Sequence, residues 1–356
     1  MNNCGIIEGY FGRPWNFRTR GTYPEFLRQH GYSFFIYAPK NDPNLRKKWD
    51  RPWSSEYTRT LQNFARRCAG FGIKFGIGYT PAGDASAFAS DPALLLERIR
   101  TIRDALPLDY FALLFDDLEN HDRDRLAVCQ LKIAELAAAE LSPQTRMIVC
   151  PSYYSTDPVL EKVFGARPAN YWNEYAGGLD PAIDIFWTGE KVCSSSYCAE
   201  HLEWFEKQFR RKAFLWDNYP VNDGKKMADF LYLKPFTGRP SCIEPHLAGH
   251  AVNPMREPYL NRITMATLAD PYRDCPLDAG SEQYWELVCS ITGRRLAAAL
   301  REDFELFTQT GLSQIPPSGL EMLKHKYSSF RNSPYGREIY RYLCGEYAFD
   351  PACLTG

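Results

Sequence analysis

The sequence lacks an excess of either charge, and it lacks any long apolar run. It contains 42 Lys and Arg against 43 Asp and Glu, which gives a formal net charge of -1. Proteins that bind nucleic acid need a surplus of basic side chains to neutralise phosphates, so we expect no nucleic-acid partner. No stretch approaches the roughly 18 apolar residues of a membrane-spanning helix, so we expect no membrane partner either.

The sequence also lacks the spacing patterns of metal and cofactor sites. Its 11 cysteines include no C-x-x-C pair and no histidine partner at zinc spacing, and the H-E-x-x-H motif is absent. Neither a G-x-G-x-x-G loop nor a G-x-S-x-G nucleophile turn occurs. We therefore expect no metal and no cofactor.

The cysteine pattern and the start of the sequence bear on the cellular compartment. An odd number of scattered cysteines fits a reducing compartment better than a disulfide scaffold. Residues 1–5 contain neither the basic region nor the apolar core of a signal peptide. We expect a cytoplasmic protein, and these patterns predict no particular oligomeric state.

The first 255 residues alternate between short apolar runs and longer stretches with helical periodicity. Most of the short runs are apolar nearly throughout, which is typical of strands buried on both faces. They predict eight strands, over residues 5–10, 33–38, 74–79, 110–116, 147–151, 183–188, 213–216 and 247–252. The longer stretches predict eight helices, over residues 23–29, 56–69, 93–105, 123–139, 159–164, 199–210, 225–232 and 257–268.

Eight strand–helix units of roughly 30 residues favour a parallel sheet, and eight strands are the number that closes a barrel. We therefore predict an α/β fold, a (β/α)8 TIM barrel. An open doubly wound sheet is the alternative, but no strand precedes the glycine-rich loop that many such folds use.

The pattern changes after residue 271. Residues 281–307 predict one long helix or two, and shorter helices are expected over residues 320–327 and 338–347. We predict two parts, a catalytic barrel over residues 1–272 and a C-terminal helical segment over residues 273–356 that packs on the barrel. No motif in the second part indicates a function.

Functional groups of such barrels stand at the carboxyl ends of the strands, where this sequence places two adjacent carboxylates, Asp116 and Asp117. Mutual repulsion and partial burial would push their pKa values apart, as acid/base catalysis requires. Successive strand side chains point to opposite faces, so both can face one cleft only if the strand turns at its end. The alternative is structural: Asp117 or Glu119 caps the next helix, and Asp116 pairs with Lys40 or an arginine.

Aromatic residues make up 15% of the sequence, and several follow the predicted strands. They favour a platform for the apolar faces of sugars, although aromatic residues also fill protein cores. The candidates for this platform are Tyr10, Phe11, Trp15, Tyr154, Trp187, Trp216 and Tyr219.

Seven short segments at the predicted strand ends carry a family resemblance. They are GIIEGYFGRPW (5–15), YAPKND (37–42), FALLFDD (111–117), CPSYY (150–154), WTGEKV (187–192), LWDN with ND (215–218, 222–223) and NP (253–254). In this order they resemble the catalytic domain of glycoside hydrolase family 84, over about residues 4 to 270. This family includes O-GlcNAcases and bacterial β-N-acetylglucosaminidases, and its fold is a (β/α)8 barrel.

The resemblance implies a retaining exo-β-N-acetylglucosaminidase that removes terminal β-linked GlcNAc from a glycan or glycoprotein and is similar to protein O-GlcNAcase. In its substrate-assisted mechanism the 2-acetamido oxygen of the sugar is the nucleophile, and an oxazoline forms. Asp116 matches the residue that holds the acetamido N–H. Asp117 matches the general acid that protonates the leaving oxygen and then activates water.

The resemblance also implies a set of sugar-binding residues. Gly9, Lys40 and Asn253 match positions that contact the sugar, and Tyr154 matches a tyrosine beside the acetamido group. The remaining matches are Trp216 and Asn218 around the N-acetyl pocket, and Asp223 as the acceptor for the 4- and 6-hydroxyls.

Some positions depart from the family pattern. Residues 219–221 and 224–225 differ from the usual loop, and Ser155 and Thr156 stand where Cys-Gly is common, so the departures concern the leaving-group side. An endo-acting, hyaluronidase-like or cell-wall glycosidase remains the alternative enzyme. An inactive GlcNAc-binding barrel is the alternative of another class, although a lectin need not keep both aspartates.

Overall fold

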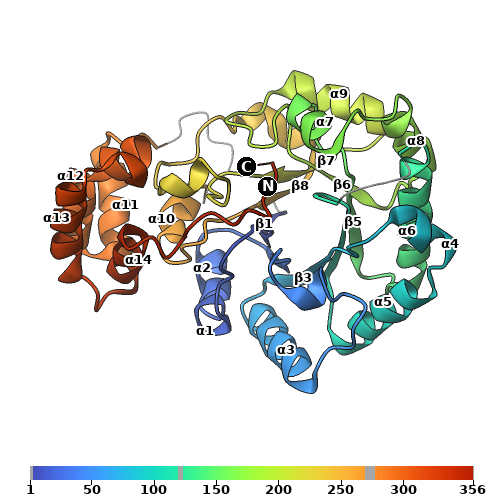
Figure 1. The fold of residues 1–356 in the computed structure, drawn as a ribbon, viewed down its shortest axis with the longest axis horizontal. Coiled ribbons are helices and arrows are strands. Elements are labelled where there is room, and N and C mark those ends of the chain that lie inside the picture. The colour runs from blue at the N-terminus through green and yellow to red at the C-terminus, as the bar shows by residue number, and fades with distance from the viewer. Residues whose placement is uncertain (1–2, 119–122, 269–276, 356) are drawn as a thin grey trace.

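The computed structural model describes residues 3–118, 123–268 and 277–355. Its centre is a closed barrel of eight parallel strands that follow one another in chain order (Figure 1). β1 pairs with both β2 and β8, which closes the sheet and confirms the predicted (β/α)8 barrel. The strands are β1 (Cys4–Glu8), β2 (Phe34–Tyr37), β3 (Lys74–Tyr79), β4 (Tyr110–Leu114), β5 (Arg146–Cys150), β6 (Asp184–Trp187), β7 (Ala213–Asp217) and β8 (Leu247–Val252).

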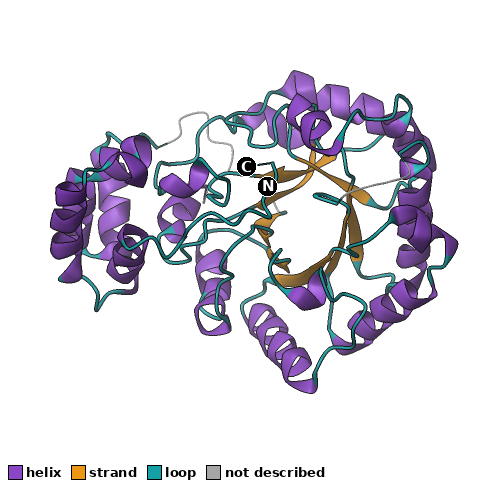
Figure 2. Cartoon of the chain, in the orientation of Figure 1, coloured by secondary structure: helices purple, strands orange, loops and turns teal. Residues whose placement is uncertain are grey.

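Helices surround the barrel, as Figure 2 shows. In α3, the Ser54 side chain caps the first turn, while Leu61, Phe64 and Cys68 are buried at helical spacing. The helices around the barrel are α1 (Phe17–Arg20), α2 (Tyr23–Gln29), α3 (Ser55–Gly70), α4 (Ala85–Ser90), α5 (Ala93–Ala105), α6 (Leu126–Glu140), α7 (Pro158–Phe164), α8 (Tyr171–Gly178), α9 (Ala199–Phe209) and α10 (Asn261–Met265). No described helix is long and apolar enough to cross a membrane.

The predicted strands over residues 74–79 and 247–252 have the bounds of β3 and β8. The predictions for β1 and β4 run two residues too far at their carboxyl ends. Tyr10 and Phe115 lie in these loop continuations and are almost fully buried. Apolar residues there line the top of the barrel rather than the sheet, so composition alone does not mark the strand end.

The helix predicted over residues 225–232 is wrong. The structure has only a 3₁₀ turn, η2 (Met227–Asp229), and the Leu231 N–H donates to the Phe307 carbonyl at 2.9 Å. A distant partner therefore draws this backbone out of helical geometry. The helix predicted over residues 257–268 shrinks to α10 and the 3₁₀ turn η4 (Ala266–Leu268), and α1, α4 and α8 were not predicted.

Within the described residues after the barrel there are four α-helices: α11 (Glu282–Thr292), α12 (Arg294–Glu302), α13 (Pro317–Ser328) and α14 (Pro334–Leu343). The predicted stretch 281–307 is thus two helices, because Gly293 between them has φ +86°. A second hydrophobic cluster joins these helices to loops of the barrel; it includes Leu231, Met255, Leu260, Trp285, Leu300 and Tyr327.

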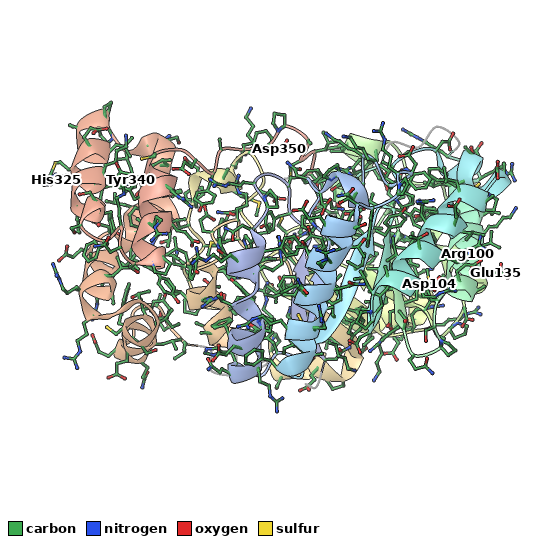
Figure 3. All side chains as sticks on the ribbon, turned by 90° about the horizontal axis from the view of Figure 1, so that it is seen from below. Arg100, Asp104, Glu135, His325, Tyr340 and Asp350 are labelled. Carbon is green, nitrogen blue, oxygen red and sulfur yellow. The ribbon has the colours of Figure 1, made fainter. Side chains whose placement is uncertain are left out.

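The predicted boundary at residues 272/273 lies outside the described residues, so the division into two parts stays a prediction. After α14 the chain does not remain with the helices. Residues 344–355 run back toward the opening of the barrel (Figure 1), and Asp350 lies between the helical part and the barrel (Figure 3).

Candidate active site

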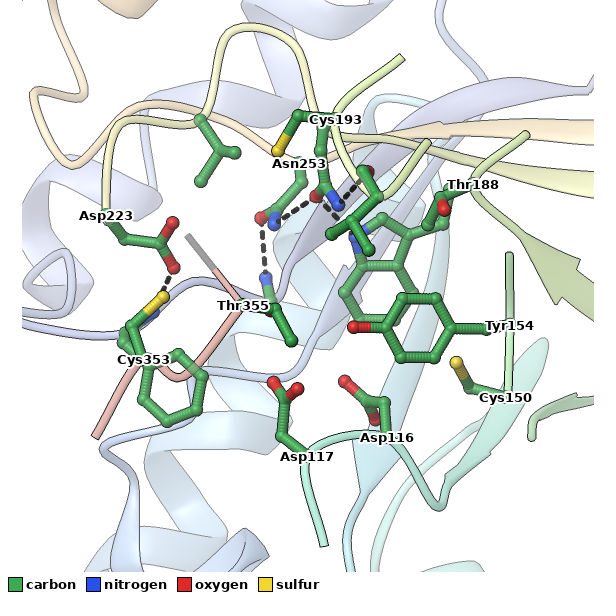
Figure 4. A pocket seen from close by; sticks show the side chains of 16 residues that line it. Asp116, Asp117, Cys150, Tyr154, Thr188, Cys193, Asp223, Asn253, Cys353 and Thr355 are labelled. Carbon is green, nitrogen blue, oxygen red and sulfur yellow. Dashed lines mark hydrogen bonds between the residues drawn. The ribbon is translucent and has the colours of Figure 1, made fainter. Parts of the chain in front are cut away.

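A pocket opens at the carboxyl ends of the barrel strands (Figure 4). Eight of the nine residues predicted for the site line this pocket, and the ninth, Lys40, contacts one of them. The lining residues are Gly9, Phe11, Asp116, Asp117, Cys150, Tyr154, Thr188, Val192, Cys193, Trp216, Asn218, Val221, Asp223, Asn253, Cys353 and Thr355.

Asp116 and Asp117 lie in the turn that follows β4. Asp117 has φ +54°, a left-handed conformation that is uncommon for residues other than glycine. This turn breaks the alternation of the strand, so that both carboxylates line the same pocket. The strand therefore turns at its end, which is the condition stated from the sequence for both carboxylates to face one cleft.

Lys40, from the loop after β2, forms an ion pair with Asp116. Its Nζ lies 2.5 Å from Asp116 Oδ2, and both side chains are buried. The other oxygen, Oδ1, has no hydrogen-bond partner among the described residues. The pairing foreseen in the structural alternative thus exists, and it leaves one oxygen of Asp116 available to a ligand.

Asp117 has a different environment. Its pKa is raised to about 6, first by burial and then by the negative charge of Asp116, against the opposing effects of Lys40 and Arg46. The Arg46 Nη2 donates to the backbone carbonyl of Asp117 at 2.7 Å, which fixes the turn. Helix α6 begins only at Leu126, without a side-chain cap, so the predicted capping role for Asp117 is wrong. Glu119 lies outside the described residues.

Three side chains on the opposite wall form one hydrogen-bond network. Asn218 Oδ1 accepts from Trp216 Nε1 at 2.9 Å and from Asn253 Nδ2 at 3.0 Å. Asn253 Oδ1 in turn accepts from the Gly9 N–H at 3.1 Å. A Cβ atom on Gly9 would lie 2.4 Å from the Trp216 ring, so only glycine permits this close packing.

Asp223 lies in the loop after β7. Its Oδ2 accepts from the Phe11 N–H at 2.8 Å, and burial raises its pKa. Asp223 could cap the helix predicted over residues 225–232 only if that helix formed, and it does not. Asp223 therefore presents a carboxylate to the pocket from the side opposite β4 (Figure 4).

The Tyr154 side chain is almost fully buried, and burial raises its pKa well above the usual range. Its backbone carbonyl accepts from the Thr188 N–H at 3.1 Å, which connects the ends of β5 and β6. The phenol group points into the pocket beside the aspartates (Figure 4).

The aromatic platform predicted from the sequence is only partly present. Of its seven candidates, Phe11, Tyr154 and Trp216 line the pocket. Trp187 instead packs among helix aromatics such as Trp204 and Phe209, which places it in the core. The rings of Tyr10, Trp15 and Tyr219 are likewise not part of the lining.

A buried ion-pair cluster supports the wall formed by β7. Asp217, between Trp216 and Asn218 in sequence, contacts Arg239 Nη2 at 2.6 Å and His250 Nε2 at 3.0 Å. Burial alone would raise the pKa of Asp217, but Arg239 and His250 outweigh it and lower the pKa to about 2. The cluster holds the end of the strand from which the network residues project.

Sequence analysis missed several residues at the pocket. Arg46 belongs to a loop without a motif, and Cys193 follows the WTGEKV segment by one residue. Cys353 and Thr355 come from the other end of the chain, and no local pattern indicates that they return to the barrel. Only the tertiary path of the chain brings these last two residues to the site.

Comparisons with known proteins agree with the family resemblance seen in the sequence. The protein O-GlcNAcases of Rattus norvegicus and Mus musculus are each 28% identical over 277 residues, which is 76% of this chain. The match covers only 30% of the length of each relative.

Solved structures share the architecture. A variant of the Thermobaculum terrenum O-GlcNAc hydrolase matches with TM-score 0.74 and 26% identity, over 96% of this chain and 74% of that one. A protein named CpGH84B matches with TM-score 0.73 and 22% identity, over 96% and 65%, and shows the same fold.

The family model described as beta-N-acetylglucosaminidase matches residues 4–308, a span that contains β1–β8 and every residue predicted for the site. This chain belongs to the beta-N-acetylglucosaminidase family, as its resemblance to glycoside hydrolase family 84 predicts.

Proposed function

We propose that this chain is a retaining exo-β-N-acetylglucosaminidase that hydrolyses terminal β-linked GlcNAc by substrate-assisted catalysis. The observation that carries the proposal is the pair Asp116 and Asp117: two adjacent carboxylates face one pocket in unlike environments. Asp116 is paired with Lys40, whereas Asp117 has a pKa raised to about 6. One suits a fixed negative charge and the other a proton donor.

The first half-reaction uses both carboxylates. The acetamido oxygen of the sugar attacks C1, and Asp116 accepts a hydrogen bond from the acetamido N–H. Asp117 gives its proton to the glycosidic oxygen as the bond from C1 to the leaving group breaks. The products are a protonated oxazoline (oxazolinium), whose N–H stays hydrogen-bonded to Asp116, and the free alcohol of the aglycone.

The second half-reaction reverses the role of Asp117. Now ionised, Asp117 removes a proton from a water molecule, whose oxygen attacks C1 and opens the oxazoline. Two successive displacements at C1 retain the β configuration. The substrate therefore supplies the nucleophile, and Asp117 supplies the acid and then the base. The proposed reaction requires no cofactor.

The other residues of the site fit roles in binding. Trp216, Asn218, Asn253 and Gly9 form a preorganised wall whose network leaves little freedom to reorganise. Tyr154 stands beside the aspartates, where the acetamido group would lie. Asp223 would accept hydrogen bonds from the 4- and 6-hydroxyls and thereby close the non-reducing end of the pocket.

Further aspects of the proposal rest on the sequence. The substrate would be a GlcNAc-containing glycan or glycoprotein, in the manner of the relatives named O-GlcNAcase. We keep the assignment of catalysis to residues 1–272 and of a helical accessory part to residues 273–356. The ten described cysteines form no disulfide bond with one another. The cytoplasmic location stays a prediction.

The test compares aryl β-GlcNAc with the matching aryl β-glucoside, which lacks the acetamide. We expect the glucoside to react orders of magnitude more slowly, and GlcNAc-thiazoline, an oxazoline mimic, to inhibit competitively. Equal turnover of the two glycosides would exclude substrate assistance. Binding of the thiazoline without turnover of either glycoside would instead favour the inactive GlcNAc-binding barrel.

A further inference from the structure

The chain segment that follows α14 lies across the opening of the candidate active site. We name residues 347–355 the tail segment. It lies beyond residue 308, where the match to the family model ends. Two of its side chains, Cys353 and Thr355, line the pocket together with Asp117 and Asp223, and Figure 4 shows them within the ring of site residues.

Contacts with loops of the barrel hold the tail segment in place. The Arg256 Nη1 donates to the Ala348 carbonyl at 2.7 Å, and the Asn41 Nδ2 donates to Asp350 Oδ2 at 2.7 Å. Asp350 also closes a turn, since its carbonyl accepts from the Cys353 N–H at 3.0 Å. This turn directs the chain from the surface at Asp350 to the pocket at Cys353.

The tail segment occupies space that a sugar would need. With the segment in place, the cavity measures about 40 Å³, room for about three water molecules. Pockets that enclose small-molecule ligands commonly measure about 300 Å³ or more. Thr355 lines the same pocket as Tyr154, the residue proposed to lie beside the acetamido group. A terminal GlcNAc and Thr355 therefore compete for the same place.

We propose that the tail segment is a displaceable plug, which fills the sugar pocket in the closed enzyme and must withdraw before GlcNAc enters. This inference rests on the proposed function. When only a fraction of the molecules is open, the apparent affinity of a ligand falls in proportion to that fraction. Weakening the plug should therefore lower KM and inhibitor Kd, while kcat stays the same.

Asp350→Ala tests the plug, because it removes the contact with Asn41 without touching the pocket. Loss of one such hydrogen bond should lower KM for aryl β-GlcNAc, and Kd for GlcNAc-thiazoline, by about 3- to 10-fold. Leu354→Ala is the matched control. The Leu354 side chain is 49% exposed and is not part of the lining, so its removal should change neither constant.

The thiol of Cys353 provides a readout that does not depend on turnover. Cys353 is buried in the closed enzyme, whereas Cys242 is exposed and serves as an internal reference. We expect alkylation of Cys353 by iodoacetamide, followed by mass spectrometry, to be faster in Asp350→Ala without ligand. GlcNAc-thiazoline should accelerate it in the wild type, because the inhibitor expels the segment.

The outcomes separate this proposal from the proposed function. An unchanged or raised KM in Asp350→Ala, with slower labelling of Cys353 under inhibitor, would show that the segment is a fixed wall of the site. Equal labelling of Cys353 in Asp350→Ala and wild type would also reject the plug. Faster labelling without a gain in thiazoline affinity would reject it too. Absence of turnover in all variants would count only against the proposed function.

Discussion

At the scale of single residues, the site depends on how one turn separates two identical side chains. Asp116 and Asp117 differ by one position, yet only Asp116 has a cationic partner within hydrogen-bond distance among the described residues. Lys40 in the loop after β2 and the left-handed conformation of Asp117 after β4 create this difference. Chemistry that needs one charged and one protonated carboxylate is therefore built from two aspartates.

The first prediction separates the roles of the two aspartates. Asp117→Ala should lose on the order of 10² or more in kcat/KM with poor leaving groups, and much less with activated aryl groups that need little protonation. Asp116→Ala should lose activity with both, because formation of the oxazoline itself is impaired. A series of aryl β-GlcNAc substrates measures this; a leaving-group dependence confined to Asp116→Ala would mean that the roles are exchanged.

The second prediction concerns the free energy of unfolding. The folded pKa of Asp117 is about 6, above its usual value of 3.8, so ionisation in the folded protein is unfavourable. The stability that Asp117 contributes is present below pH 4 and is lost as the pH rises through about 6. Asp117→Asn should therefore raise Tm more at pH 7.5 than at pH 4.

Thermal unfolding of Asp117→Asn at the two pH values measures this effect. Asp124→Asn, at an exposed aspartate, is the control and should show the same small change at both. A Tm difference for Asp117→Asn that does not depend on pH would contradict the prediction.

The third prediction concerns Gly9. An added methyl group would meet the Trp216 ring at 2.4 Å, and the ring is held by its hydrogen bond to Asn218. Gly9→Ala should lower the free energy of unfolding by about 1–3 kcal/mol and weaken thiazoline binding at least about 10-fold. Gly177→Ala in α8, where a Cβ meets nothing within 4 Å, should leave binding unchanged.

At the scale of elements, the strands and most of the long helices could be predicted, because their periodicity reflects burial on a repeating architecture. β3, β8, α2 and α5 have their predicted bounds. Residues 225–232 could not be predicted, since the partner that extends them, Phe307, is far away in sequence. Strand ends were misjudged where buried loops continue the apolar pattern.

The predicted site residues come together because each lies at the end of a strand or in the loop after it, and a closed barrel brings all its strand ends to one opening. Their roles are still proposals. The pocket residues Cys353 and Thr355 could not be found in this way. They belong to neither a strand nor a motif, and only the return of the chain from α14 places them there.

The fourth prediction concerns the loop after β7 that carries Asp223. Charge-assisted hydrogen bonds to the sugar hydroxyls should contribute roughly 10- to 150-fold in binding. Asp223→Ala should weaken GlcNAc-thiazoline by about that factor. Asp223→Asn keeps an acceptor for the Phe11 N–H and serves to separate loss of the loop contact from loss of the charge.

The same carboxylate predicts the mode of attack. A chain extended at O4 would meet Asp223, so chitin oligomers should release only GlcNAc from their ends. Product sizing decides this: internal cleavage without free monosaccharide would favour the endo-acting alternative.

At the scale of the whole molecule, the barrel and the C-terminal helices are joined by shared packing. Leu231, Met255 and Leu260, from loops of the barrel, are buried in the same cluster as residues of α11–α14. Polar contacts also cross this packing; in two of them, Glu338 on α14 accepts from the backbone N–H groups of Tyr259 and Leu260 at 2.8 and 2.9 Å.

The fifth prediction uses this contact as a pH probe of the junction. Burial raises the pKa of Glu338 to about 8, far above its usual value of 4.5. The stability that Glu338 contributes is therefore complete below pH 4.5 and is lost as the pH rises through about 8. Glu338→Gln keeps an acceptor oxygen but cannot ionise, so its Tm should fall less than that of the wild type between pH 6 and pH 9.

Two further variants complete the test. Glu338→Ala leaves two buried N–H groups without their acceptor and should cost about 1–3 kcal/mol below pH 4.5, and less at pH 9, where the contribution of Glu338 in the wild type is lost. Glu305→Gln, at an exposed position, should follow the wild type throughout. Because the hydrophobic cluster spans both parts, the loss should appear as a shift of one cooperative transition. Separate melting of barrel and helices, with the barrel unaffected by Glu338→Ala, would show that the junction contributes nothing to the stability of the catalytic part.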